Sequence, residues 1–193
     1  MTDAKLWSIF VDAALINNFV LAYFLGICPF LGVSSKLETA TRMGLAVSFV
    51  MLVASICAYT INLLLAAVNA PYLRIISYIL VIASTVQLVE MLVRKISPAT
   101  FRAMGIYLPL ITTNCAILGL ALFQTNRGYG FSQAVVFALG AGAGFALALV
   151  LMAGIREKLE LGNVPDLVRG TAAALVVAGI LSMSFMGFAG LGR

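Results

Sequence analysis

The sequence predicts an all-helical integral membrane protein, and three observations support this fold class. Of the 193 residues, 63% are hydrophobic, only 10% are charged, and none is histidine. A soluble domain could not bury that much apolar surface. The apolar residues form unbroken runs rather than the alternating segments of about ten residues that a membrane β-barrel shows. Residues 1–193 are therefore expected to form a single transmembrane domain.

Six apolar stretches reach, or nearly reach, the roughly 20 helical residues that cross a hydrocarbon core. They cover residues 6–33, 43–67, 75–93, 104–123, 131–155 and 171–191. The links between them are short and leave no room for a soluble catalytic domain. The sequence therefore predicts six transmembrane helices, with any chemistry located in or at the bilayer.

Basic residues orient the six predicted spans. The loops alternate between two sides of the membrane, and one side holds eight lysines and arginines while the other holds four. Because lysine and arginine are enriched in cytoplasmic loops, the richer side is predicted to be cytoplasmic. Both termini then lie outside the cytoplasm. The net charge of +5 follows from this topology and does not indicate nucleic-acid binding.

The first and fourth predicted spans contain helix breakers beside a cysteine. In the first span Gly26 and Pro29 flank Cys28, and in the fourth span Pro109 lies upstream of Cys115. Such breaks free backbone groups that lipid cannot satisfy, so they persist where protein or a ligand covers them. Helices 1 and 4 are therefore expected to be broken, with their inner ends meeting near the membrane interior. For either span alone, a proline kink packed against small neighbours is the alternative.

The two cysteines open the same short pattern, Cys-x-x-Leu-Gly, at residues 28–32 and 115–119. Polar residues precede each one: Asn17 and Asn18 in the first span, and Thr112, Thr113 and Asn114 in the fourth. The chain divides near residue 97 into halves of about 1–97 and 98–193, each with three predicted spans. Because three is an odd number, homologous halves would be inverted in the membrane. The sequence thus indicates two inverted three-helix repeats.

Two cysteines without any histidine limit the metal chemistry of the chain alone. A structural zinc site uses four cysteine, histidine or carboxylate ligands, and an iron–sulfur cluster uses about four thiolates. Cys28 and Cys115 would be half of such a site, so the other half would have to come from a second chain. A disulfide between them would add little to six packed helices. Cys57 lies in an otherwise apolar span and is expected to contribute to core packing.

The remaining spans carry fewer functional signals. Glu90, near the cytoplasmic end of the third span, is expected to pair with Arg94 rather than to conduct an ion. Asp12, near the external end of the first span, is expected to be solvated. The fifth span contains the small-residue run 140–144, and the sixth is rich in alanine, glycine and methionine. Both are expected to pack within the chain rather than against another protein.

Three segments together resemble the A subunit of the bacterial Rnf complex. They are residues 17–21 (Asn-Asn-Phe-Val-Leu), 24–34 (Phe-Leu-Gly-Ile-Cys-Pro-Phe-Leu-Gly-Val-Ser) and 108–119 (Leu-Pro-Leu-Ile-Thr-Thr-Asn-Cys-Ala-Ile-Leu-Gly). The loop 153–158 (Ala-Gly-Ile-Arg-Glu-Lys) also fits, and the likeness covers essentially the whole chain. The E subunit of the sodium-pumping NADH:quinone reductase shares that loop and the Asn-Cys-Ala motif. The proline after Cys28 and the short loop 68–74 favour the Rnf protein.

The resemblance implies the cofactor and the partners of the chain. In that family the A subunit pairs with the homologous E subunit in the opposite orientation, and each contributes two cysteines to one intramembrane [2Fe-2S] cluster. By motif, the iron ligands here would be Cys28 and Cys115. Further partners would be membrane lipid and the B, C, D and G subunits of the complex, with flavins and other iron–sulfur clusters on those other proteins.

The resemblance also implies a function and a location. The complex moves electrons between ferredoxin and NAD and couples this to translocation of Na⁺ or H⁺, while this chain by itself catalyses nothing. It would lie in the bacterial inner membrane with both termini on the periplasmic side. Two alternatives from other classes are a small inverted-repeat secondary transporter, whose asparagines and threonines would coordinate substrate or sodium, and a purely structural subunit.

Polar residues beside the cysteines are candidate hydrogen-bond donors to such a cluster. A cluster with four thiolates carries negative charge, which is costly in hydrocarbon unless nearby dipoles offset it. The candidates are Asn114, Thr113, Asn17 and Asn18, together with Thr112. Their alternative role is packing between helices, worth under about 1 kcal/mol each.

Overall fold

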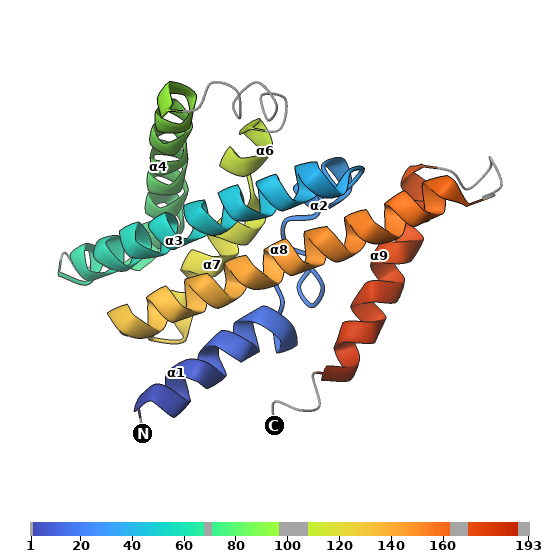
Figure 1. Cartoon of the computed structure of the whole chain (residues 1–193). Coiled ribbons are helices and arrows are strands. Elements are labelled where there is room, and N and C mark those ends of the chain that lie inside the picture. The colour runs from blue at the N-terminus through green and yellow to red at the C-terminus, as the bar shows by residue number, and fades with distance from the viewer. Residues whose placement is uncertain (1, 68–70, 97–107, 163–169, 189–193) are drawn as a thin grey trace.

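A computed structural model of the chain describes residues 2–67, 71–96, 108–162 and 170–188 (Figure 1). Over these ranges the fold is all-helical and contains no β-strand, which confirms the predicted fold class. The helices are α1 (Thr2–Val11), α2 (Ile27–Gly32), α3 (Leu37–Ala67), α4 (Arg74–Ile96), α6 (Leu108–Thr112), α7 (Cys115–Asn126), α8 (Phe131–Leu161) and α9 (Thr171–Met186). A π-helical turn, Asp12–Ile16, extends α1, and a short 3₁₀ turn, Pro71–Leu73, precedes α4.

Three described helices are long and apolar enough to cross a membrane, namely Leu37–Ala67, Arg74–Met91 and Phe131–Leu161. The helix Thr171–Met186 is apolar but shorter. The first and fourth predicted spans are each divided between shorter helices. The structure thus confirms a membrane protein with several apolar helices, while the six spans and the inverted repeat stay predictions. The proposed boundary between the halves, near residue 97, lies outside the described residues.

Helices α3 and α8 form the centre of the fold and run antiparallel, side by side (Figure 1). Small residues allow this close approach. A Cβ added at Gly44 of α3 would lie 2.9 Å from the Cβ of Ala146, and one at Gly142 of α8 would lie 2.9 Å from the Cβ of Ser48. Helices α4 and α7 pack against α3, while α1 and α9 pack against α8.

A second face of α8 packs against α1 and the π-helical turn that follows it. A Cβ at Gly140 would lie 2.7 Å from the backbone oxygen of Phe10, and one at Gly144 would lie 2.6 Å from that of Ala14. The small-residue run of the fifth predicted span therefore packs against two elements of its own chain. This confirms the expectation that it serves internal packing.

Two buried polar contacts attach α7 to the rest of the fold. The Ser55 hydroxyl of α3 donates to Gln124 Oε1 at 2.6 Å, and Gln124 Nε2 donates back to the Ser55 carbonyl at 2.9 Å. Both side chains are at most 2% exposed. The hydroxyls of Tyr78 on α4 and Thr125 on α7 form a further hydrogen bond at 2.7 Å. Helix α7, which begins at Cys115, is thus attached to α3 and α4 through its C-terminal end.

The structure corrects the expectation that Asp12 is solvated. Its Oδ2 lies 3.0 Å from Arg127 Nη1, and both side chains are less than one-third exposed. Arg127 follows α7, so the ion pair joins the first span to the fourth. Of Glu90, the structure shows a half-buried side chain. Its predicted partner, the side chain of Arg94, lies outside the described residues.

Candidate functional site

The first predicted span is interrupted upstream of Cys28. The π-helical turn ends at Ile16, and helix resumes only at Ile27, the first residue of α2. Within the break Phe24 has φ of 57° and Gly26 has φ of 77°. Backbone of this left-handed kind suits glycine, so Gly26 can turn the chain into α2 without strain from a Cβ. The predicted break in helix 1 is therefore present.

The side-chain amide of Asn18 attaches this break to α8, and both its Nδ2 and its Oδ1 make two hydrogen bonds. Its Nδ2 donates to the backbone oxygens of Ala14 at 3.0 Å and Gly144 at 2.7 Å. Its Oδ1 accepts from the N–H groups of Val20 at 3.0 Å and Leu21 at 3.3 Å. The side chain is 1% exposed. Backbone groups freed by the break are thus satisfied by one buried amide.

The fourth predicted span is interrupted directly before Cys115. Helix α6 ends at Thr112, and α7 begins at Cys115 with Asn114 as its N-cap. The Asn114 Oδ1 accepts from the N–H of Ala116 at 3.0 Å, which is the usual way for an asparagine to start a helix. The predicted break in helix 4 is therefore present as well.

The two breaks lie against each other. The backbone N–H of Gly26 donates to Cys115 Sγ, with a nitrogen-to-sulfur distance of 2.8 Å. A Cβ added at Gly26 would lie 3.1 Å from Asn114 Oδ1, 3.3 Å from the Cβ of Ala116 and 2.7 Å from the ring of Phe145. The fold therefore brings together the two breaks, which lie next to the two cysteine motifs and are far apart in the sequence.

Both motif cysteines are exposed on this chain, whereas Cys57 is half-buried. Cys57 lies on α3 and accepts a contact from the Thr85 hydroxyl of α4 at 3.8 Å, which agrees with a packing role. Among the described residues, no group of three or more histidine, cysteine, aspartate or glutamate side chains could hold a metal ion. In that part of the chain, Cys28 and Cys115 are thus two accessible thiols without a third ligand.

The Asn114 side chain has an unused donor beside Cys115. It is 5% exposed, and its Nδ2 has no hydrogen-bond partner among the described residues. A buried N–H without an acceptor costs about 1–3 kcal/mol. A hydrogen-bond acceptor placed next to this amide would remove that cost. The start of α7 adds a partial positive charge, which also favours negative charge on that sulfur.

The other candidate donors are placed differently. Asn17 Nδ2 donates to Asp12 Oδ1 at 2.6 Å, and its Oδ1 accepts from the Tyr23 hydroxyl at 3.1 Å. Both Nδ2 hydrogens of Asn18 are used within the fold, so this side chain has none left for a cluster sulfur. Thr113 lies at the fourth-span break and is exposed. Asn114 therefore has a free side-chain donor next to Cys115, whereas the donors of Asn18 are used elsewhere in the fold.

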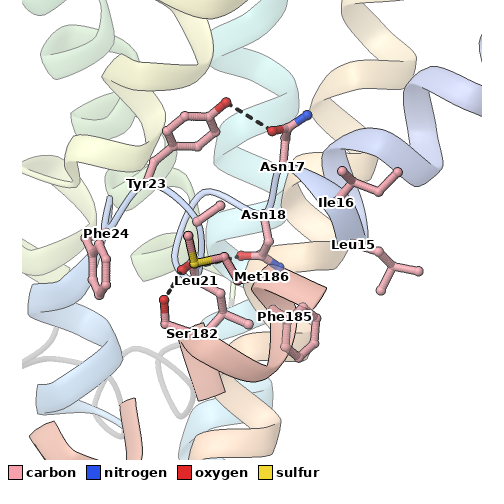
Figure 2. Close-up of a pocket in the computed structure, with 11 residues that line it drawn as sticks. Leu15, Ile16, Asn17, Asn18, Leu21, Tyr23, Phe24, Ser182, Phe185 and Met186 are labelled. Atoms are coloured by element: carbon pink, nitrogen blue, oxygen red, sulfur yellow. Dashed lines mark hydrogen bonds between the residues drawn. The ribbon is translucent and has the colours of Figure 1, made fainter. Parts of the chain in front are cut away.

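A pocket of about 320 Å³ lies between the first break and α9. Figure 2 shows the residues that line it. Its lining includes Asn17, Asn18 and Tyr23 on one side and Ser182 and Phe185 on the other. The hydroxyl of Ser182 donates to the Leu21 carbonyl at 2.7 Å and so satisfies another group freed by the break. Sequence reasoning missed Ser182, although the two serines of the sixth span, Ser182 and Ser184, are a visible signal.

Comparisons with known proteins agree with the motif resemblance. A family model described as "Rnf-Nqr subunit, membrane protein" matches residues 6–192. The chain is 58% identical over 184 residues to the A subunit of the ion-translocating oxidoreductase complex of Syntrophotalea carbinolica, covering 95% of each chain. It is 55% identical over 192 residues to the protein of the same name from Escherichia fergusonii, covering 99% of this chain and 98% of the relative. The Serratia proteamaculans protein of that name is 55% identical over 184 residues, covering 95% of each chain.

Proposed function

We propose a function from the premise that the chain belongs to the Rnf-Nqr family of membrane subunits. Its curated relatives are named as the A subunit of an ion-translocating oxidoreductase complex, and the chain covers nearly their full length. We assign it the same place: a membrane subunit of such a complex, acting as part of a translocase and not as an enzyme alone. The complex would transfer electrons between ferredoxin and NAD and couple this to movement of Na⁺ or H⁺.

Within that complex, Cys28 and Cys115 would supply half of the ligands of an intramembrane [2Fe-2S] cluster. The observation that carries this assignment is the contact between the two breaks, in which the N–H of Gly26, two residues before Cys28, donates to Cys115 Sγ. Both thiols are exposed on the chain, so a second protein with two more thiols can reach them. An iron–sulfur cluster needs about four thiolates, and a homologous E subunit in the opposite orientation would complete the set.

When bound, the cluster would accept and return one electron at a time, linking flavin and iron–sulfur carriers on opposite sides of the bilayer. The residues of this chain would hold the cluster and offset its negative charge. The Gly26 N–H already points at one ligand sulfur, and the unpartnered Nδ2 of Asn114 is the best placed further donor. Hydrogen bonds to the sulfurs are one means by which a protein sets the reduction potential of a cluster.

The proposal extends to topology and partners. Three described helices can span a membrane, and the two broken segments together with α9 would supply three more spans. The six spans would form two inverted repeats in the bacterial inner membrane, with both termini periplasmic. The remaining partners would be the B, C, D and G subunits, which would carry the flavins and the other iron–sulfur clusters.

The transporter alternative finds less support in the described residues. A substrate site at the first break would need free polar groups from Asn17 and Asn18. The Asn18 amide is fully used by backbone partners, and Asn17 is engaged with Asp12 and Tyr23. These asparagines therefore close the break rather than offer ligands to a substrate.

The test is the iron content and the reduced-state EPR spectrum of the purified complex. Cys28→Ser and Cys115→Ser should each remove one [2Fe-2S] signal while the complex stays assembled. Cys57→Ser is the matched control, because its half-buried thiol lies between α3 and α4, and it should leave the signal unchanged. A native spectrum and normal iron in either motif variant would refute the cluster assignment.

A further inference from the structure

Two neighbouring residues of α8 hold the turn that joins α2 to α3. They belong to residues 153–158, which are expected from the sequence to be a loop and which the structure shows as part of α8. Arg156 Nη1 donates to the Leu31 carbonyl at 2.8 Å and contacts Ser34 Oγ at 2.9 Å. Glu157 Oε1 accepts from the backbone N–H of Leu37 at 3.3 Å. Leu31 lies in the last turn of α2, and Leu37 is the first residue of α3. Consecutive side chains of one helix thus cap the end of α2 and the start of α3.

Helix α2 depends on such contacts because it has only six residues. A helix this short is not stable by itself, and its last carbonyls have no partner within the helix. The Val33 N–H satisfies the Pro29 carbonyl at 3.0 Å, and the Arg156 guanidinium satisfies that of Leu31. A cation at the C-terminal end also interacts favourably with the helix dipole. Arg156 therefore fixes one end of α2 to α8.

The other end of α2 is fixed at the second cysteine. Gly26 is the N-cap of α2, and its N–H donates to Cys115 Sγ. Cys28, the second residue of α2, lies between these two attachments. It is three residues before Leu31, a separation of about 4.5 Å along a helix axis. A tilt of α2 at its Arg156 end would therefore move the Cys28 thiol relative to Cys115.

We propose that Arg156 is a positioning residue that sets the orientation of Cys28 by holding the turn between α2 and α3. This inference rests on the proposed function, in which Cys28 must meet an iron atom together with Cys115. Both hydrogen bonds come from one guanidinium nitrogen, Nη1, whose two N–H groups have fixed directions in the guanidinium plane, whereas the N–H groups of a lysine ammonium rotate freely. The partly buried position of both hydrogen bonds keeps water from replacing them.

The test uses the purified complex with Arg156→Gln, Arg156→Lys or Lys158→Gln. Changes around metal ligands typically lower metal affinity about 10–100-fold, so Arg156→Gln should lower the [2Fe-2S] EPR signal per assembled complex and alter its line shape. Arg156→Lys should restore part of the signal, because an ammonium can still donate to Leu31. Lys158→Gln removes the same charge from an exposed side chain two residues away and should leave the spectrum native.

Two outcomes would overturn the inference. If Arg156→Gln lowers only the amount of assembled complex and leaves the signal per complex native, Arg156 stabilises the fold without positioning Cys28. If the native complex shows no cluster signal, the proposed function fails, and maleimide labelling decides the positioning separately. In a Cys57→Ser background, Arg156→Gln should then change the labelling rate of Cys28 relative to Cys115 severalfold. An unchanged ratio would refute the positioning role.

Discussion

The contact between the two breaks depends on the absence of a side chain at Gly26, and Gly26→Ala tests this directly. The residue has φ of 77°, where a left-handed conformation costs a non-glycine residue about 1–2 kcal/mol. The added methyl would lie 2.7 Å from Phe145 Cε2 and 3.1 Å from Asn114 Oδ1. The Phe145 ring is fully buried and cannot move away freely, so overpacking adds about 1–3 kcal/mol.

The two terms together predict a loss of about 2–5 kcal/mol, which is a large part of the roughly 5–15 kcal/mol that stabilises a typical domain. For a chain of this size, the apparent Tm should fall by at least about 4 °C. The chain can relieve the overlap by separating the breaks, which removes the hydrogen bond from residue 26 to Cys115 Sγ. Iron per purified complex should therefore fall as well.

The matched control for this variant is Gly154→Ala in α8. No heavy atom lies within 4 Å of a Cβ built at Gly154, and its φ is not in the left-handed region. Alanine in a helix interior is favoured over glycine by about 0.5–1 kcal/mol, so this variant should be neutral or slightly more stable. The assays are thermal unfolding in detergent and iron content. Native iron and native Tm in Gly26→Ala would show that the two breaks do not need this contact.

Three further substitutions test single contacts. Asn114→Asp keeps the N-cap oxygen, removes the free donor and adds a carboxylate. Loss of the donor and the added negative charge both disfavour the reduced cluster, so its midpoint potential in an EPR redox titration should fall by at least roughly 50 mV, or about 1 kcal/mol for one electron; an unchanged potential would exclude the donor role. Ser182→Ala leaves the Leu21 carbonyl without its hydrogen bond and should lower the free energy of unfolding by about 1 kcal/mol. Ser184→Ala is the control, because the Ser184 hydroxyl donates only within α9, and it should leave stability unchanged; equal Tm values for the two variants would contradict this. Arg127→Gln removes the ion pair with Asp12 and should cost at most about 1 kcal/mol, with the difference from native shrinking as salt rises; a salt-independent loss in Tm would argue against an electrostatic role.

The sequence predicts both breaks because glycine, proline and asparagine have local effects on the backbone. Gly26 and Asn114 stand where α2 and α7 begin, and the repeated Cys-x-x-Leu-Gly pattern indicates that the two starts belong together. Longer contacts are beyond such reasoning. Asn18 finds its partner Gly144 across 126 positions, and Asp12 finds Arg127 across 115. No local pattern specifies those pairs, which is why sequence reasoning expects a solvated Asp12 and leaves Asn18 open between a cluster donor and a packing role.

The long-range contacts divide the fold into a frame and attached segments. Helices α3 and α8 form the frame, because small residues let them pack closely along their lengths. Each cysteine stands at the start of a shorter helix that is fastened to this frame by side chains. Arg156 fastens α2 to α8, and Gln124 fastens α7 to α3. Any movement of one cysteine relative to the other must therefore break or bend these few polar contacts before it disturbs the frame. Besides Gly26, whose N–H contacts Cys115 Sγ, residues that do not touch sulfur therefore help to control the geometry of the thiols. Substitutions at Arg156 or Gln124 should alter a cluster while leaving the helices folded.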